Sequence, residues 1–121
     1  MNTVFWGKVK KGKQRGKKLG FPTANILFRK KIPHGIYISK TKINKKTHPS
    51  ITFIGNAKTF EEKDIFAETY ILAFNKNIYN EWVSITLIKK IRDNKKFESA
   101  EKLVEQMKKD EDTAKKYFNY V

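Results

Sequence analysis

Short alternating segments separated by turn residues are the feature that most limits what this chain can fold into. Apolar and polar residues alternate with a period of two in several runs, and glycine, proline or asparagine bounds most of them. That period is typical of β-strands. The strands are predicted at residues 3–10, 23–30, 36–43, 50–56, 65–74 and 82–91, with a polar hairpin connection over 43–50. Strands at such short spacing indicate a mainly β fold, a small antiparallel barrel or sandwich.

The period changes near the C-terminus, where a helix is predicted. The apolar positions recur at Ala100, Leu103, Val104 and Met107, which is helical spacing. Glu98 or Ser99 suits the start of this helix as a cap. Asp110 resembles the cap of a second helical segment, so the tail is expected to restart there.

Length and composition set limits on the class of protein. The chain has 121 residues, of which 39% are hydrophobic, which favours one domain over 1–121 with its own core. It has no cysteine, which excludes disulfides and thiolate metal sites, and its two histidines argue against a multi-histidine zinc site. No apolar run approaches the ~20 residues of a membrane span, and the N-terminus lacks the layout of a signal peptide. We therefore expect a cytoplasmic chain with no membrane partner.

The positive charge is unevenly distributed. The net charge is +15, yet residues 1–60 contain no Asp or Glu, and all 12 acidic residues lie from Glu61 onward. Such a field attracts anions: nucleotides, nucleic acid or acidic lipid. A lysine-rich surface kept for solubility is the simpler explanation, but it does not account for acids missing from one half only.

A basic, glycine-rich stretch follows the first predicted strand. Its glycines and cations are Gly12, Lys13, Arg15, Gly16, Lys17, Lys18 and Gly20. The spacing is not that of a Walker loop, but glycines let successive backbone N–H groups face an anion. From these residues alone, a phosphate-binding loop and a solvated basic loop both remain open.

The stretch ends in Pro22-Thr23-Ala24-Asn25. Pro22 fixes a rigid turn, and in an extended segment Thr23 and Asn25 project to the same face. Hydroxyl and amide oxygens are neutral ligands of the kind that Mg²⁺ accepts beside substrate phosphates. A turn that satisfies its own backbone explains the same residues.

Glu68 is a carboxylate inside an otherwise apolar strand. In the predicted strand it shares a face with Phe66, Tyr70 and Leu72. The other face consists of Ile65, Ala67, Thr69 and Ile71, and either face suits the core. Beside a nucleotide, such a carboxylate can accept the proton of an attacking hydroxyl. A solvent-facing residue on a half-exposed strand is the alternative.

Two residues near the predicted helix complete the candidate list. Arg92 suits pairing with a ligand or with a neighbouring carboxylate. Phe97 suits packing of the helix against the sheet, or stacking on a flat ring.

The sequence resembles the riboflavin kinase (flavokinase) family in five blocks that occur in the family's order. They are GKVKKGKQRGKKLGFPTANI, PHGIYIS, ITFIGNAKTF, AETYILAFNKNIYN and IRDNKKFESAEKLVEQMKKD. The chain departs from the family pattern at Lys17, Lys58, Asn80 and Asn94, where the family has arginine, proline, glycine and an acidic residue. Many members carry this domain behind an adenylyltransferase domain. Because this chain starts at Met1 directly before the first strand, we expect no FAD synthesis from it.

The resemblance implies a six-stranded antiparallel Greek-key β-barrel with a C-terminal helix. It implies phosphorylation of riboflavin to FMN with ATP and Mg²⁺ or another divalent ion. Thr23 and Asn25 would bind the metal and the nucleotide phosphates, Glu68 would be the catalytic base, and Arg92 and Phe97 would line the flavin site. The nucleotide-binding residues would be Gly12, Arg15, Gly16, Lys17, Lys18, Gly20, Pro22, Thr23 and Asn25.

Two alternatives compete with a kinase. A basic barrel that binds single-stranded nucleic acid fits the charge but gives no reason for Glu68 or the Pro22–Asn25 string. A degenerate domain that binds flavin without kinase activity fits the departures, but Thr23, Asn25 and Glu68 are retained. The expected partners are therefore riboflavin or FMN and ATP or ADP, with nucleic acid less favoured, and the chain is expected to be a monomer.

Overall fold

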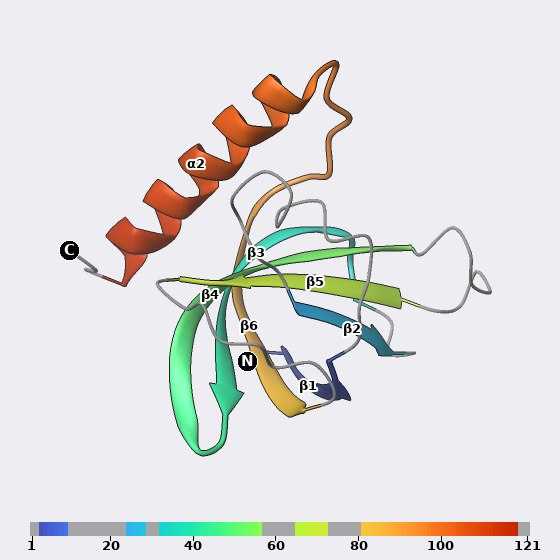
Figure 1. Ribbon diagram of the computed structural model, residues 1–121, viewed down its shortest axis with the longest axis vertical. Helices are drawn as coiled ribbons and strands as arrows, with labels where there is room; N and C mark the ends of the chain where they lie inside the picture. Colours follow the sequence, from blue (N-terminus) through green and yellow to red (C-terminus); the bar gives the residue numbers. More distant parts are fainter. Residues whose placement is uncertain (1–2, 10–23, 29–31, 57–64, 73–80, 119–121) are drawn as a thin grey trace.

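The computed structural model describes residues 3–9, 24–28, 32–56, 65–72 and 81–118. Within these ranges, strands are followed by one helix (Figure 1). The elements are β1 (Thr3–Lys8), β2 (Ala24–Phe28), β3 (Gly35–Ile43), β4 (Lys46–Asn56), β5 (Ile65–Ile71), β6 (Trp82–Arg92) and α2 (Ala100–Tyr117). The prediction of a mainly β chain with a C-terminal helix is confirmed.

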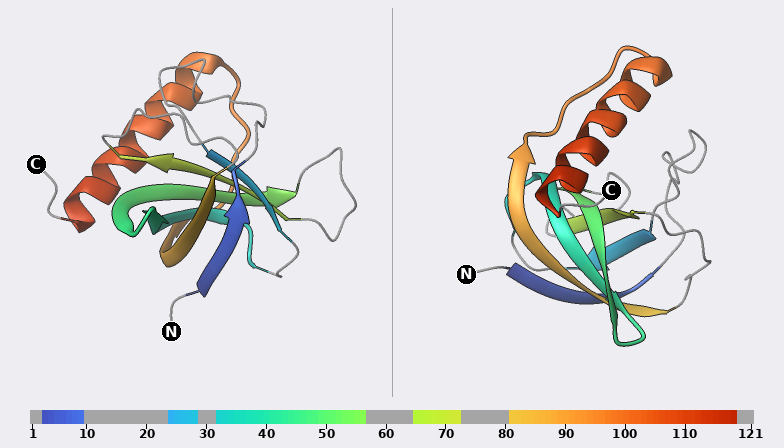
Figure 2. Two further views of the ribbon diagram at one scale, coloured as in Figure 1. Left: turned by 60° about the horizontal axis from the view of Figure 1, so that its bottom comes forward. Right: turned by 90° about the vertical axis from the view of Figure 1, so that its left-hand side faces the viewer.

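The strands pair into one antiparallel sheet in the order β1-β6-β3-β4-β5-β2. Although β1 and β2 lie at opposite ends of this order, they contact each other. The sheet is therefore strongly curved, with an inner and an outer face. Figure 2 shows α2 over one end of the sheet and β1 at the other.

The β3–β4 hairpin is tighter than the sequence predicts. Asn44 and Lys45 have positive φ angles of 49° and 70°, and the strands pair from Ile43↔Lys46 outward. Two consecutive left-handed residues make the turn type whose twist matches a two-residue hairpin. The hairpin predicted over 43–50 is therefore confirmed, but its connection is shorter than predicted: β4 begins at Lys46 and includes Pro49.

The inner face holds the main core. Its buried apolar residues are Phe5, Val9, Ile32, Tyr37, Ile43, Ile54, Ala67, Ile71, Val83, Ile85 and Leu87. In β5, the alternation that the sequence left open is decided, because Ala67 and Thr69 are fully buried while Glu68 is half-buried. Glu68 therefore belongs to the outer face.

Five hydroxyl side chains are also fully buried on the inner face. Ser39, Thr41, Ser50, Thr52 and Thr69 link β3, β4 and β5 through hydroxyl–hydroxyl distances of 2.7 to 2.9 Å. Each buried hydroxyl thus has a partner, which offsets its desolvation cost.

The helix packs on the outer face. Ala114 belongs to a buried cluster with Ile36, Ile38, Ile51 and Leu72, so α2 packs against β3, β4 and the residue after β5. Ser99 caps the helix as predicted, accepting a hydrogen bond from the Lys102 backbone N–H at 3.2 Å. Among the described residues, none of the helical segments is long and apolar enough to cross a membrane.

The predicted helix start at Asp110 is wrong. The helix runs without interruption from Ala100 to Tyr117, and Asp110 is one of its buried residues. Its carboxylate accepts hydrogen bonds from Arg92 and Gln106. The helix continues through this position, so no helix end is present for Asp110 to cap.

Candidate functional site

The strand register brings three predicted site residues into one row across the sheet. Asn25 of β2 lies directly opposite Glu68 of β5, and Glu68 lies opposite Phe53 of β4. The row continues through Ile36 of β3 to Arg92 of β6. Since opposite residues in an antiparallel pair lie about 5 Å apart and share a face, positions 25 and 68 are immediate neighbours. Predicted metal, base and flavin positions thus follow one line on the outer face.

Glu68 lies beside the helix-covered part of that face. Its strand neighbour on the same face is Tyr70, which packs against the outer core cluster. Burial and a hydrogen bond to the Glu111 carboxylate of α2 together raise the pKa of Tyr70 to about 12. Tyr70 therefore stays a neutral hydroxyl at ordinary pH and ties the helix to the strand that carries Glu68. Glu111 also pairs with Lys115 at 3.4 Å.

The segment between β6 and α2 contacts β4 next to Phe53. The Asn94 amide donates to the Ile54 carbonyl at 3.2 Å, anchoring this segment to β4. A Cβ added at Gly55 would lie 2.8 Å from the Phe53 ring, so glycine leaves the ring room to lie against the backbone. Asn94, which departs from the family's acidic residue, thus has a structural use: a carboxylate could not donate this bond.

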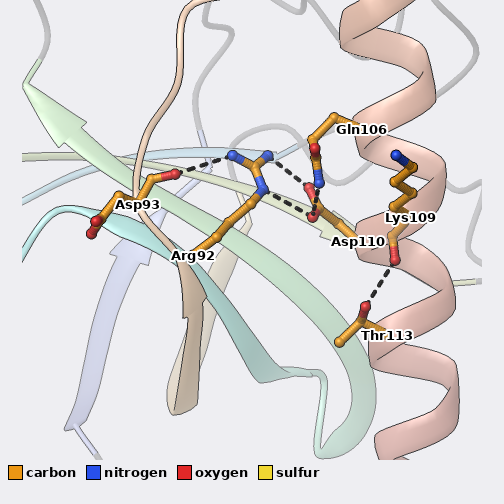
Figure 3. Close-up of polar contacts among 6 residues, drawn as sticks. All are labelled: Arg92, Asp93, Gln106, Lys109, Asp110 and Thr113. Atoms are coloured by element: carbon orange, nitrogen blue, oxygen red, sulfur yellow. Dashed lines mark hydrogen bonds and ion pairs between the residues drawn. The ribbon is translucent and has the colours of Figure 1, made fainter.

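Arg92 is held by a carboxylate of the helix (Figure 3). Its Nε and terminal nitrogen donate to the two oxygens of Asp110 at 2.9 and 2.7 Å, and Gln106 donates to the same carboxylate at 3.1 Å. The sequence left open whether Arg92 pairs with a ligand or with a neighbouring carboxylate, and in the structure it pairs with the carboxylate. This bidentate pair fixes the end of β6, and so the start of the β6–α2 segment, against α2.

Phe97 lies in the same segment and is half-buried. The Arg92 guanidinium carbon lies 5.9 Å from its ring centroid, and the Lys95 ammonium lies 5.8 Å from it. Both distances are within the range of a cation–π contact. The contact of Phe97 with a flavin ring stays a prediction.

Most of the predicted nucleotide site lies outside the described residues. This applies to Gly12, Arg15, Gly16, Lys17, Lys18, Gly20, Pro22 and Thr23. Asn25 is placed by its backbone register alone. Within the described ranges there is no group of three or more His, Cys, Asp or Glu residues that could hold a metal.

The sequence analysis missed Asp110 as the partner of Arg92. A signal was present, because positions 103, 107, 110 and 114 recur every three or four residues and place Asp110 on the buried stripe of the helix. An aspartate on such a stripe requires a charged partner, since an unpaired buried carboxylate is costly.

Comparisons with known proteins identify the family of this chain. The family model for riboflavin kinase matches residues 1–118. The chain is 41% identical over 121 residues to a bifunctional riboflavin kinase/FMN adenylyltransferase of Buchnera aphidicola, covering 95% of this chain and 38% of that protein. It thus spans well under half the length of that relative.

Two solved structures share the fold. A Streptococcus pneumoniae chain described as a macrolide-efflux protein matches with a TM-score of 0.84 and 33% identity, over 94% of this chain and 38% of that one. The riboflavin kinase of Trypanosoma brucei matches with a TM-score of 0.64 and 24% identity, over 96% of this chain and 79% of that one. The family model, which extends over nearly every residue, decides the assignment: this chain belongs to the riboflavin kinase family.

Proposed function

We propose that this chain transfers the γ-phosphoryl group of ATP to the ribityl 5′-hydroxyl of riboflavin, giving FMN and ADP. The observation that carries the proposal is the row in which position 25 lies directly opposite Glu68. It brings the predicted metal and phosphate ligand next to the predicted base. Phosphoryl transfer needs these two functions close together, because most of its catalysis comes from positioning and charge neutralisation.

Glu68 acts as the base in this proposal. Its carboxylate accepts the 5′-hydroxyl proton as that oxygen forms a bond to the γ-phosphorus, and the bond from phosphorus to the bridging oxygen of ADP breaks. A half-buried carboxylate on a strand suits this task, since the sheet fixes its position. A positioned base of this kind contributes about 10²- to 10⁴-fold to the rate.

The nucleotide side is proposed from the family pattern. Thr23 and Asn25 would hold a divalent ion through neutral oxygens, and a hard cation such as Mg²⁺ suits these ligands. When bound, the ion neutralises charge on the phosphates. The glycines and cations from Gly12 to Gly20 would cover the phosphates with backbone N–H groups and positive side chains.

The flavin side is proposed at the β6–α2 segment. Phe97 would contact the ring system, and Arg92, whose guanidinium is engaged by Asp110, would act by positioning this segment. The contact between β1 and β2 supports closure of the sheet into the family's six-stranded Greek-key barrel. We further propose that residues 1–121 act as one riboflavin kinase domain, monomeric and cytoplasmic.

The test is FMN formation from riboflavin and ATP with Mg²⁺, followed by chromatography with fluorescence detection. We expect FMN from the native chain and a loss of about 10²-fold or more in Glu68→Gln, which keeps the shape of the side chain but cannot accept the proton. Glu105→Gln, an exposed helix position, is the matched control and should retain full activity. A folded native chain that forms no FMN would overturn the proposal.

A further inference from the structure

Both tryptophans of the chain lie exposed on the same part of the outer face. Trp6 of β1 is 66% exposed and Trp82 of β6 is 69% exposed. Trp6 pairs with Ser84, two residues along β6 from Trp82, so the two indoles occupy diagonal positions on one face. Diagonal neighbours lie about 7–8 Å apart, within reach of large rings. Folding alone gives no reason to leave two large aromatic side chains in water.

Lysines surround these tryptophans. Lys8 lies directly opposite Trp82, and Lys42 and Lys40 of β3 lie opposite Ser84 and Thr86 of β6. All three lysines are exposed. We call this surface the Trp–Lys face, made up of Trp6, Lys8, Lys40, Lys42, Trp82 and Ser84.

The Trp–Lys face carries no opposing charge of its own. The sequences of β1, β3, β4 and β6 contain no Asp or Glu. Glu81, the partly exposed residue before Trp82, is the adjacent acid, and the three lysines outnumber it. The field at this surface is therefore positive, and its polar groups between the rings are hydroxyls and ammonium groups. Such a surface is complementary to a flexible polyanion that also presents flat rings.

The face is separate from the described part of the proposed kinase site. Glu68 lies on β5, which pairs with β2 and β4, whereas the Trp–Lys face lies on β1, β6 and β3. Figures 1 and 2 show α2 and β1 at opposite ends of the sheet. None of the six residues has a role in the proposed phosphoryl transfer. The kinase function therefore leaves the exposed tryptophans and their lysines unexplained.

We propose that the Trp–Lys face binds single-stranded nucleic acid, with bases stacking on Trp6 and Trp82 and phosphates contacting Lys8, Lys40 and Lys42. Aromatic side chains next to a basic surface are the parts that such binding uses, and stacking on them tolerates any base. An acidic membrane is a poorer occupant, because hydroxyls rather than aliphatic side chains separate the two rings. A second copy of the chain is poorer still, since two positive faces repel each other.

The first measurement uses the tryptophans themselves, since the chain has only these two. Unlabelled oligo(U) of about 12 nucleotides, within the range that one small barrel covers, is added in excess ATP and Mg²⁺ to keep the kinase site occupied. We expect saturable quenching of tryptophan fluorescence. If another method detects binding but tryptophan fluorescence is not quenched, the nucleic acid binds elsewhere and the proposal is overturned. An absence of binding would also overturn it.

The second measurement separates stacking from charge, using anisotropy of labelled oligo(U). Trp6→Ala and Trp82→Ala should each weaken binding about tenfold or more, while Tyr117→Ala, another exposed aromatic, should not. Lys8→Glu with Lys42→Glu should lower the slope of log affinity against log salt by about 1.4, the value for two lost contacts to a single strand.

Lys108→Glu with Lys109→Glu is the charge-matched control, since both lysines are exposed on α2. An equal loss in the two double variants would mean general attraction by net charge and would overturn the proposal. Quenching by vesicles of anionic lipid, with none by oligo(U), would also overturn it and identify a membrane surface. FMN formation should be unchanged in all these variants.

Discussion

At the scale of single residues, the contact between Arg92 and Asp110 joins β6 to α2 beside the proposed flavin site. The side chains are 21% and 8% exposed, and the guanidinium and carboxylate meet through two hydrogen bonds. The pair joins a residue at the end of β6 to one in the middle of α2. Its role is therefore to hold the β6–α2 segment, which carries Asn94 and Phe97, at one place over the sheet.

Asp110→Asn should lower the free energy of unfolding by about 2–3 kcal/mol, because it leaves a largely buried guanidinium without its counter-charge. Urea unfolding measures this. Asp112→Asn, an exposed aspartate of the same helix, is the control and should change stability by less than about 0.5 kcal/mol. Equal effects of the two substitutions would mean that the Arg92 contact adds nothing specific.

Tyr70 gives a pH dependence whose direction follows from its pKa. The folded chain raises this pKa from 10.0 to about 12, so the folded state holds the phenol proton more tightly than the unfolded state does. The stabilisation is complete below pH 10 and is lost as the pH rises toward 12. The difference in unfolding free energy between the native chain and Tyr70→Phe should therefore shrink over that interval.

Tyrosinate absorbance provides an independent measurement. Tyr70→Phe should remove one tyrosine from the late part of the alkaline titration. If Tyr70→Phe leaves the late part of the titration unchanged, burial and the Glu111 hydrogen bond do not control the pKa of Tyr70.

At the scale of elements, the buried hydroxyl network links the side chains of β3, β4 and β5. Thr52 is its centre: its hydroxyl lies 2.8 Å from that of Ser39 and 2.9 Å from that of Thr69. Thr52→Val keeps the volume but leaves both partners short of a hydrogen bond in a buried site. We expect a loss of about 1–3 kcal/mol in unfolding free energy. Thr47→Val, at an exposed position of the same strand, should be nearly neutral, and a comparable loss there would contradict the argument.

The elements also show which structural features could be predicted from the sequence. Alternation located the strands, and Ser99 located the start of the helix, because both signals are local. The hairpin was located, but its connection was predicted too long, because the two turn residues Asn44 and Lys45 adopt positive φ without a glycine to mark them. Asp110 was misread because its partner lies 18 residues away on another element. The opposition of positions 25 and 68 depends on register, which no single stretch of sequence encodes.

At the scale of the whole molecule, the net charge of +15 should affect stability. Like charges repel most in the compact state, so the charge lowers the free energy of unfolding at neutral pH. Salt screens this repulsion, and the Debye length falls from about 30 Å at 0.01 M to about 10 Å at 0.1 M. The melting temperature at pH 7 should therefore rise by several degrees over that range of NaCl.

The same experiment near pH 10 is the control, because the isoelectric point is about 10.0 and the mean repulsion vanishes there. The melting temperature should then be nearly independent of NaCl over the same range. If salt instead lowered the melting temperature at pH 7, attractive pairs such as Lys90–Asp93 and Lys102–Glu98 would outweigh the repulsion. These pairs lie on exposed side chains and contribute little each, whereas exposed lysines occur on β1, β3, β4 and β6. Repulsion should therefore dominate, and a bound polyanion, by neutralising it, should raise the melting temperature more than an equal ionic strength of NaCl does.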